Sequence, residues 1–199
     1  MKLVLATRNK GKIQEIRDVL ADLGIQLSSL DDCGSVAELI EKGGTLEENA
    51  MHKALTVARQ LRLPALADDS GLEVDHLKGG PGVFSSRFAG DGASDEENNE
   101  KLLEALKGVP AQKRGAAFRC VMVLAMPDGR FWTAEGRCEG RIAEVPTGTG
   151  GFGYDPLFFV PELGKTFAEL RPEVKNRISH RAKALIKIRR ILGKIHDCS

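Results

Sequence analysis

The order of strand-like and helix-like segments constrains the fold of this chain most strongly. In the first half, short apolar runs such as Leu3–Ala6 and Ala65–Ala67 alternate with segments of helical periodicity. In the second half, residues 117–126 and 130–135 flank Pro127–Gly129, a pattern that is typical of a β-hairpin. Helices between strands favour parallel pairing, whereas a hairpin is antiparallel. The sequence therefore predicts an α/β fold with a mixed, twisted sheet and flanking helices.

Start and stop signals place the helices. Apolar residues at helical spacing over 13–23 predict a helix that ends at Gly24. Residues 45–48 and 94–97 have the sequence of capping boxes, so we expect helices to begin there, and a last helix to begin near Ser179. The apolar side of that last helix comprises Leu185, Ile188, Leu192 and Ile195. Further strands are expected at 26–30, 142–145 and 157–160, and an irregular loop at 79–82.

Length and composition exclude several classes of protein. The chain has 199 residues, a length that fits one domain over residues 1–199. Its net charge of +1 gives no overall positive electrostatic field that would attract a polyanion. No window approaches 18 apolar residues, as a membrane span requires, and the first apolar run is too short for a signal peptide. The four cysteines include no C-x-x-C pair, so we expect reduced thiols and a cytoplasmic location.

Two adjacent aspartates, Asp68 and Asp69, follow the apolar run 65–67. We expect a strand to end there, with Ser70 and Gly71 turning the chain. Neighbouring side chains on extended backbone point opposite ways, so at most one carboxylate faces a ligand site directly. Adjacent carboxylates repel each other, and a metal cation or a basic partner relieves that repulsion. The alternative is an exposed turn in which Asp and Gly supply only turn geometry.

The segment Thr7–Lys12 lies between the first strand and the first helix. A helix N-terminus presents free backbone N–H groups and the positive end of the helix dipole, which favour a phosphate. Thr7 and Asn9 add neutral hydrogen-bonding groups, and Lys12 adds a positive charge. The segment lacks the spacing of a P-loop. It indicates anion binding, with a simple helix cap by Thr7 or Asn9 as the alternative.

Residues 148–155 form a glycine-rich segment that carries Phe152, Tyr154 and Asp155. Its spacing matches G-x-G-x-x-G formally, but a dinucleotide fingerprint must follow a first strand and begin a helix. Here Pro156 and a strand-like run follow instead. An aromatic ring beside hydrogen-bonding groups is able to stack on a nucleobase. The segment indicates a base-binding loop or, alternatively, a long hairpin turn with core aromatic residues.

Two further groups of polar residues carry weaker signals. One lies around the start of the last helix and comprises Lys175, Ser179, His180 and Arg181. An arginine there opposes the helix dipole, which indicates a ligand or a carboxylate partner, whereas a histidine at a helix start is more often structural. The other lies on or before the helix expected from residue 45 and comprises Glu41, Glu47, Glu48, Asn49 and Lys53. Spacing alone does not select a ligand among them.

In this order and spacing, the motifs resemble the inosine/xanthosine triphosphate pyrophosphatase family. The resemblance extends from Lys2 into the last helix. It rests on Thr7, Asn9, Lys12, Glu41, residues 48–50, Lys53, residues 67–72, Pro81, Gly82, Arg87, residues 148–156, Lys175, Ser179, His180 and Arg181.

The resemblance implies hydrolysis of ITP, dITP and XTP to a nucleoside monophosphate and pyrophosphate. It also implies an elongated mixed sheet with flanking helices, two lobes around a central cleft, a homodimer, and the use of Mg²⁺. We therefore expect a cytoplasmic enzyme that binds a nucleoside triphosphate, and neither a nucleic acid nor a membrane.

The motifs and the resemblance together assign roles to residues. We expect Glu41 and Asp69 to bind Mg²⁺, and Asp69, tuned by Asp68, to be the general base for the attacking water. Residues expected at the phosphates are Thr7, Arg8, Asn9, Lys10, Gly11, Lys12, Lys53 and Lys175, with Ser70 also contacting the substrate. Residues expected at the base are Phe152, which stacks on it, Gly153, Tyr154 and Asp155, which border it, and His180 and Arg181, which donate to O6.

Two other classes of protein compete with this hypothesis. An aspartyl-phosphate phosphatase also places acids at a strand end, but its Asp-x-Asp motif lies near the N-terminus, whereas Asp68 and Asp69 are adjacent. A non-catalytic nucleotide sensor or an RNA-binding module would use the glycine-rich loop and the basic last helix. In that case the acidic residues would repel phosphate unless a metal is present. Mg²⁺-dependent pyrophosphate release separates the enzyme from the sensor.

Overall fold

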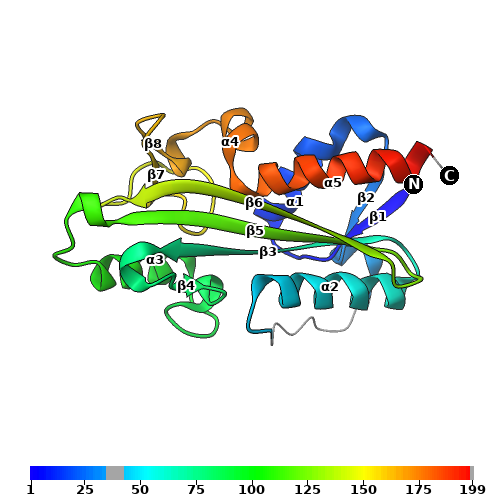
Figure 1. Cartoon of the computed structure of the whole chain (residues 1–199), viewed down its shortest axis with the longest axis horizontal. Coiled ribbons are helices and arrows are strands. Elements are labelled where there is room, and N and C mark those ends of the chain that lie inside the picture. Colours follow the sequence, from blue (N-terminus) through cyan, green and yellow to red (C-terminus); the bar gives the residue numbers. More distant parts are fainter. Residues whose placement is uncertain (35–42, 198–199) are drawn as a thin grey trace. The chain divides into compact units, whose positions relative to one another are not determined.

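The computed structural model describes residues 1–34 and 43–197 and has the mixed α/β fold that the sequence predicts (Figure 1). Its sheet has eight strands in the order β2-β1-β3-β5-β6-β7-β8, with β4 paired to β3. Pairing of β1 with β2 and β3 is parallel, whereas pairing of β3 with β4, and of β7 with β6 and β8, is antiparallel. The strands are β1 (Lys2–Leu5), β2 (Gln26–Ser29), β3 (Ala65–Val74), β4 (Pro81–Gly82), β5 (Gly115–Ala125), β6 (Phe131–Ile142), β7 (Phe158–Val160) and β8 (Lys165–Thr166).

The α-helices begin and end close to the predicted positions. They are α1 (Lys10–Leu20), α2 (Leu46–Leu61), α3 (Asp95–Ala105), α4 (Pro172–Ile178) and α5 (His180–Asp197). Gly24 adopts a left-handed conformation after the short helical turn that extends α1, as expected of a helix stop. The sequence did not predict α4, a helix of seven residues that begins with a proline.

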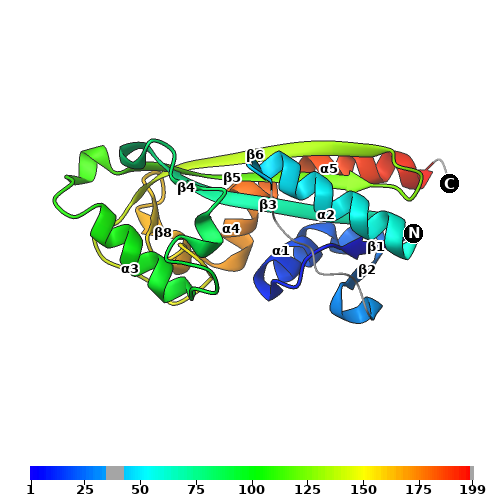
Figure 2. The same cartoon turned by 90° about the horizontal axis from the view of Figure 1, so that it is seen from below.

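The described residues cluster into two compact units, and β3, β5 and β6 contribute residues to both. The first unit comprises Met1–Asp69, Cys120–Gly136 and His180–Ser199. In it, α1 and α5 lie on one face of the strands and α2 lies on the other (Figure 1). Figure 2, the view from below, shows α2 running along β3. The core between the strands and the α1/α5 pair contains Leu3, Leu5, Ile16, Leu66, Met122, Leu185, Ile188 and Leu192.

The second unit comprises Ser70–Arg119 and Arg137–Ser179 and has its own aromatic core. The ring of Phe158 lies 4.6 Å from that of Phe118 and 4.7 Å from that of Phe167, measured between centroids. Arg114 fixes the chain after α3, because its buried guanidinium donates to the carbonyls of Leu106 and Val109. The prediction of a single domain with two lobes around a central cleft stays a prediction.

The prediction that a strand ends at Asp68 was wrong, since β3 continues without a turn to Val74. The strand continues because both carboxylates have cationic partners, which the next subsection describes. Gly71 is needed for sheet pairing rather than for a turn, because a Cβ atom there would lie 2.4 Å from the carbonyl oxygen of Gly82. Pro81–Gly82, expected in an irregular loop, forms β4 beside it.

Two smaller predictions also need correction. The separate strand expected at 142–145 is absent from the described residues, and Ile142 is instead the last residue of β6. The expected capping box at residue 45 forms only in part. Thr45 accepts from the backbone N–H of Glu48, but the Glu48 carboxylate accepts from Gly44 rather than from Thr45.

Where the structure describes them, the helices include none long and apolar enough to cross a membrane. Among the described residues, Cys33, Cys120 and Cys138 form no disulfide bond, and Cys198 lies outside the described residues.

The capping box of α3 is complete and gives a stability prediction. Ser94 accepts from the backbone N–H of Glu97, and the Glu97 carboxylate accepts from that of Ser94. We expect Ser94→Ala to lower the free energy of unfolding by about 1 kcal/mol, because a helix N-terminal N–H group loses its acceptor. Urea denaturation measures this change, and an unchanged midpoint would show that the cap contributes nothing.

Candidate active site

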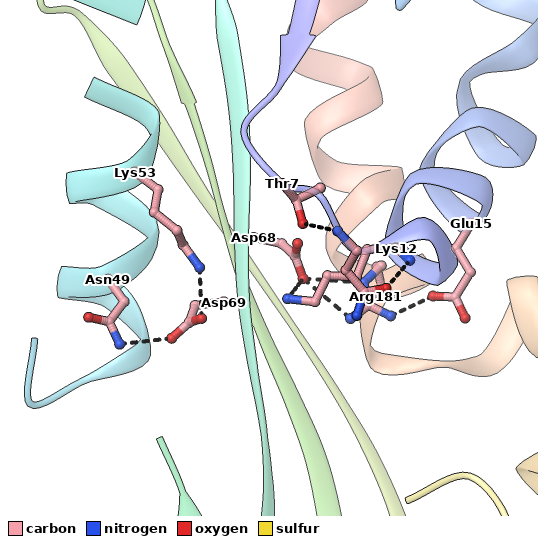
Figure 3. Close-up of polar contacts among 9 residues, drawn as sticks. Thr7, Lys12, Glu15, Asn49, Lys53, Asp68, Asp69 and Arg181 are labelled. Carbon is pink, nitrogen blue, oxygen red and sulfur yellow. Dashed lines mark hydrogen bonds and ion pairs between the residues drawn. The ribbon is translucent and has the colours of Figure 1, made fainter. Parts of the chain in front are cut away.

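Asp68 and Asp69 lie in the middle of β3 and point to opposite faces of the strand (Figure 3). Both residues are nearly inaccessible to solvent, with exposed fractions of 2% and 5%. The exposed turn considered as an alternative is therefore wrong. Burying two neighbouring carboxylates is costly unless each has a partner of opposite charge. Each aspartate has such a partner, and the two partner sets come from different helices.

Asp68 faces α1 and the start of α5. Its Oδ2 atom lies 3.0 Å from Nζ of Lys12 and accepts from the guanidinium of Arg181 at 3.3 Å. Burial alone would raise the pKa of Asp68, but the charges of Lys12 and Arg181 outweigh it and hold the pKa well below its usual range. Asp68 is thus a permanent anion that fixes the positions of two cations.

Arg181 also pairs with Glu15, which the sequence did not identify as a site residue. Burial alone would lower the pKa of Arg181, but Asp68 and Glu15 raise it, so the guanidinium stays charged. The helical spacing in the sequence could have identified Glu15, because it follows Lys12 by three residues and therefore lies on the same side of α1. The carboxylate partner expected for an arginine at this helix start is therefore confirmed, and base recognition by Arg181 and the buried His180 stays a prediction.

The segment Thr7–Lys12 leads from β1 into α1. The Asn9 side chain accepts from the backbone N–H of Lys12 at 3.0 Å, so the capping alternative is confirmed for Asn9. Thr7 accepts from the backbone N–H of Asn9 at 3.2 Å, and the exposed Arg8 pairs with Asp31. The first turn of α1 carries no acid but does carry lysines, which oppose the helix dipole. This arrangement favours an anion at the start of the helix. Because Asn9 also acts as the helix cap, anion binding by this segment stays a prediction.

Asp69 faces α2. Its Oδ1 atom lies 2.9 Å from Nζ of Lys53, and its Oδ2 atom accepts from the side-chain amide of Asn49 at 3.1 Å. Lys53 and Asn49 are four residues apart and therefore share one side of the helix. The side-chain oxygen of Asn49 accepts from the backbone N–H of Gly43. Asn49 thus links the Asp69 carboxylate to the chain that leads into α2.

The predicted metal ligands are Glu41 and Asp69, and Glu41 lies outside the described residues. Among residues 1–34 and 43–197, no cluster of three or more metal-binding side chains occurs. Mg²⁺ at nucleotide sites is commonly bound by one or two carboxylates together with water and substrate phosphates. Asp69 fits this pattern better than Asp68, because Asp68 lies between two cations, Lys12 and Arg181, whereas Asp69 pairs with one, Lys53.

The glycine-rich segment lies in the second unit and contributes Asp155 to a further buried ion pair. The Nζ atom of Lys175 lies 2.5 Å from Oδ2 of Asp155, which also accepts from the backbone N–H of Phe152. Tyr154 belongs to the hydrophobic core, as the hairpin alternative proposed, and its hydroxyl donates to the carbonyl of Ser85. Burial and the charge of Asp95 raise the pKa of Tyr154, so it stays a neutral donor.

Phe152 is half-buried, and Nζ of Lys175 lies 4.9 Å from the centre of its ring. The other ring beside this ammonium group is Phe167, at 5.5 Å. A cation over an aromatic face stabilises the orientation of the ring. Lys175 was expected at the phosphates, and the structure pairs it with Asp155 and these rings. The phosphate role of Lys175 and the stacking role of Phe152 stay predictions.

The remaining predicted site residues have less defined surroundings. Ser70 follows Asp69 in β3 and is half-buried, Gly11 lies in the first turn of α1, and Lys10 is the exposed first residue of that helix. In the first unit, the structure therefore brings together the Thr7–Lys12 segment, Asp68 and Arg181, and places Lys53 beside Asp69. In the second unit it brings together Phe152, Asp155 and Lys175.

Comparison with known proteins agrees with this arrangement. A model of the Ham1 family matches residues 3–191. A dITP/XTP pyrophosphatase from Desulforamulus reducens is 55% identical over 196 residues, which is 98% of this chain and 98% of that protein. A dITP/XTP pyrophosphatase from Geobacter sulfurreducens is 54% identical over 192 residues, 96% of each. The structure of a HAM1 protein from Coxiella burnetii superposes with a TM-score of 0.88 at 44% identity, covering 98% of this chain and 99% of that one.

The matched region includes all the site residues described above, from Thr7 to Arg181. The fold, the order of the motifs and the similarity over nearly the full length agree with one another. We conclude that this chain belongs to the Ham1 family.

Proposed function

We propose that this protein hydrolyses non-canonical purine nucleoside triphosphates (ITP, dITP and XTP) to the monophosphate and pyrophosphate, and so removes them from the nucleotide pool. The observation that carries the proposal is the pair of adjacent buried carboxylates, one enclosed by Lys12 and Arg181 and the other paired with Lys53. Such buried charges are costly and are typical of active sites. The names of relatives more than half identical to this chain support the same reaction.

The phosphate chain is proposed to bind at the start of α1. The backbone N–H groups there, with the side chains of Thr7, Asn9 and Lys12, offer hydrogen bonds and positive charge. Asp68 supports this role because its ion pair holds the Lys12 ammonium in place. Further contacts are proposed for Arg8, Lys10, Gly11, Lys53, Ser70 and Lys175.

Asp69 is proposed as the general base that accepts a proton from the attacking water. Its carboxylate is held by Lys53 and Asn49, so it has a fixed direction on the α2 face of β3. Asp69 and Glu41 are proposed to hold Mg²⁺, which when bound neutralises charge on the phosphates. The water attacks phosphorus, the bond to the pyrophosphate oxygen breaks, and the monophosphate retains the new oxygen.

Recognition of the base is proposed to follow from the chemistry of its edge. Hypoxanthine and xanthine present an O6 acceptor where adenine presents an amino donor. His180 and Arg181 offer donors to O6, and an adenine amino group would leave those donors unpaired. Phe152 is proposed to stack on the base, with Gly153, Tyr154 and Asp155 beside it.

We propose that the protein acts in the cytoplasm as a homodimer, with a small nucleotide as its substrate and neither a nucleic acid nor a membrane as a partner. The spacing of the four cysteines, with no C-x-x-C pair, is typical of reduced thiols and supports a reducing compartment. The family resemblance supports the homodimer.

The proposed reaction is tested by measuring pyrophosphate release with Mg²⁺ from ITP, XTP, dITP, GTP and ATP. We expect faster release from the first three, because GTP carries an additional 2-amino group and ATP lacks the O6 acceptor. Equal rates on all five would contradict recognition through O6 while retaining the reaction. No release from any of them would contradict the proposed function and favour a nucleotide sensor.

A further inference from the structure

The N-terminal part of α3 contacts the glycine-rich segment at Gly153. The carboxylate of Asp95 accepts from the backbone N–H of Gly153 at 2.6 Å. The side-chain amide of Asn99 donates to the carbonyl oxygen of Gly153 at 2.9 Å. Both contacts lie inside the second unit. The two side chains therefore hold one glycine from both sides, and they come from a helix outside the predicted site.

The two contacts fix two different peptide groups. The N–H of Gly153 belongs to the peptide bond that follows Phe152, and its carbonyl belongs to the bond that precedes Tyr154. Gly153 has a φ angle of +61°, and apart from its chain neighbours no atom of the described residues lies within 4 Å of where a Cβ would be. Glycine is therefore required by the backbone angle and not by crowding. Because glycine has more accessible backbone conformations than other residues, hydrogen bonds from outside the segment are able to fix the backbone at this position.

The backbone N–H of Asp155 closes the turn by donating to the carbonyl of Phe152 at 3.3 Å, and other contacts hold the neighbours of Gly153, but the N–H and carbonyl of Gly153 itself bond to α3. The Tyr154 hydroxyl donates to the carbonyl of Ser85 at 2.8 Å, and Asp155 accepts from the backbone N–H of Phe152 at 3.0 Å. Neither contact involves the backbone polar groups of Gly153. The direction in which the Phe152 ring leaves the chain thus depends on Asp95 and Asn99 as well as on Asp155.

We propose that Asp95 and Asn99 are positioning residues that set Phe152 for stacking on the purine base and so determine affinity for the base. This inference rests on the proposed function, in which Phe152 contacts the base. Neither residue is proposed to touch the substrate. Asp95 and Asn99 act on the base only through the two backbone groups of Gly153 that they bind.

The chemistry of Asn99 makes the proposal testable by small changes. Its Nδ2 atom donates to the carbonyls of both Gly153 and Asp95, and within the described chain its Oδ1 atom accepts no hydrogen bond. Asn99→Asp keeps the size of the side chain but directs a carboxylate oxygen at two carbonyl oxygens. Asn99→Ala removes both donors without that repulsion, so it serves as the second variant if Asn99→Asp folds poorly.

A matched control is available at the N-terminus of the same helix. Ser94→Ala removes the cap of α3 but leaves the contacts of Gly153 with Asp95 and Asn99 in place. A general loosening of α3 therefore affects this control and the test variants alike, whereas loss of the Gly153 contact affects only the Asn99 variants.

The experiment measures KM and kcat for ITP together with the binding of two probes, IMP and inorganic tripolyphosphate. IMP carries the base, and tripolyphosphate carries only the phosphates. For Asn99→Ala we expect KM for ITP and Kd for IMP to rise by about tenfold, the scale of one lost hydrogen bond, with kcat and tripolyphosphate binding unchanged. Ser94→Ala should leave all four quantities close to those of the wild type.

Three outcomes would overturn the inference. They are unchanged IMP binding in both Asn99 variants, equal weakening of IMP and tripolyphosphate, and an equal effect of Ser94→Ala. The proposed function is judged separately by the wild type, because IMP binding requires no turnover. A wild type that binds IMP but releases no pyrophosphate from ITP contradicts the reaction, and the variants then still test the positioning role through IMP binding.

Discussion

Asp69→Asn is expected to lower kcat for ITP by about 10²–10⁴-fold, because a positioned general base typically contributes a factor of this size. The change replaces a carboxylate with an amide of the same shape, and the amide cannot accept the proton from water. Its oxygen still accepts from Lys53, so we expect the variant to fold, with a lower free energy of unfolding because the buried Lys53 ammonium loses its anion. Pyrophosphate release under saturating ITP measures the effect, with circular dichroism to compare the folds.

Glu73→Gln is the matched control for this prediction. Glu73 lies in the same strand, and its carboxylate pairs with Arg137 rather than with a proposed catalytic group. We expect its kcat to stay close to that of the wild type. If Asp69→Asn retained near-normal kcat, Asp69 would not be the base, and the water would have to be activated by another group.

Asp68→Asn is expected to lower the free energy of unfolding at pH 7 by about 3–5 kcal/mol, the usual cost of breaking a buried ion pair from one side. The amide would leave the buried guanidinium of Arg181 and the ammonium of Lys12 without the anion between them. Urea denaturation measures the loss. Asp128→Asn is the control, since Asp128 pairs with Arg130 in an exposed turn, and we expect little change there.

The same ion pair gives stability a pH dependence of known sign. The pKa of Asp68 is lower in the folded protein than in the unfolded chain. The stabilisation is therefore fully present above about pH 4 and is lost as the pH falls below that value. Asp68→Asn should flatten this acid limb of the stability profile. A variant as stable as the wild type, or an acid limb of unchanged slope, would contradict the assignment.

Much of the fold could be predicted because it depends on local signals. Helical spacing, the capping box at Ser94 and the stop at Gly24 each act within a few residues, and each prediction was confirmed. The strand end at Asp68 was predicted wrongly because acidic residues usually end strands. That rule fails here since the balancing cations, Lys12 and Arg181, are distant in sequence.

The candidate site was predictable as a set of residues but not as a set of partners. Alternation along a strand was enough to predict that Asp68 and Asp69 face opposite ways. The assignment of Lys175 to Asp155, and of Glu15 to Arg181, requires the tertiary structure. For the same reason the contact of Asn99 with Gly153, 54 residues apart, carries no signal in the sequence.

The interleaving of the two units in the sequence limits how this protein can be divided. The chain passes from one unit to the other inside β3, β5 and β6, and again between Ser179 and His180. No contiguous gene fragment therefore encodes either unit, and neither can be exchanged between relatives as a cassette. The first of these passages is the peptide bond between Asp69 and Ser70, so the proposed base is the last residue of the first segment of one unit and is bonded covalently to the first residue of the other.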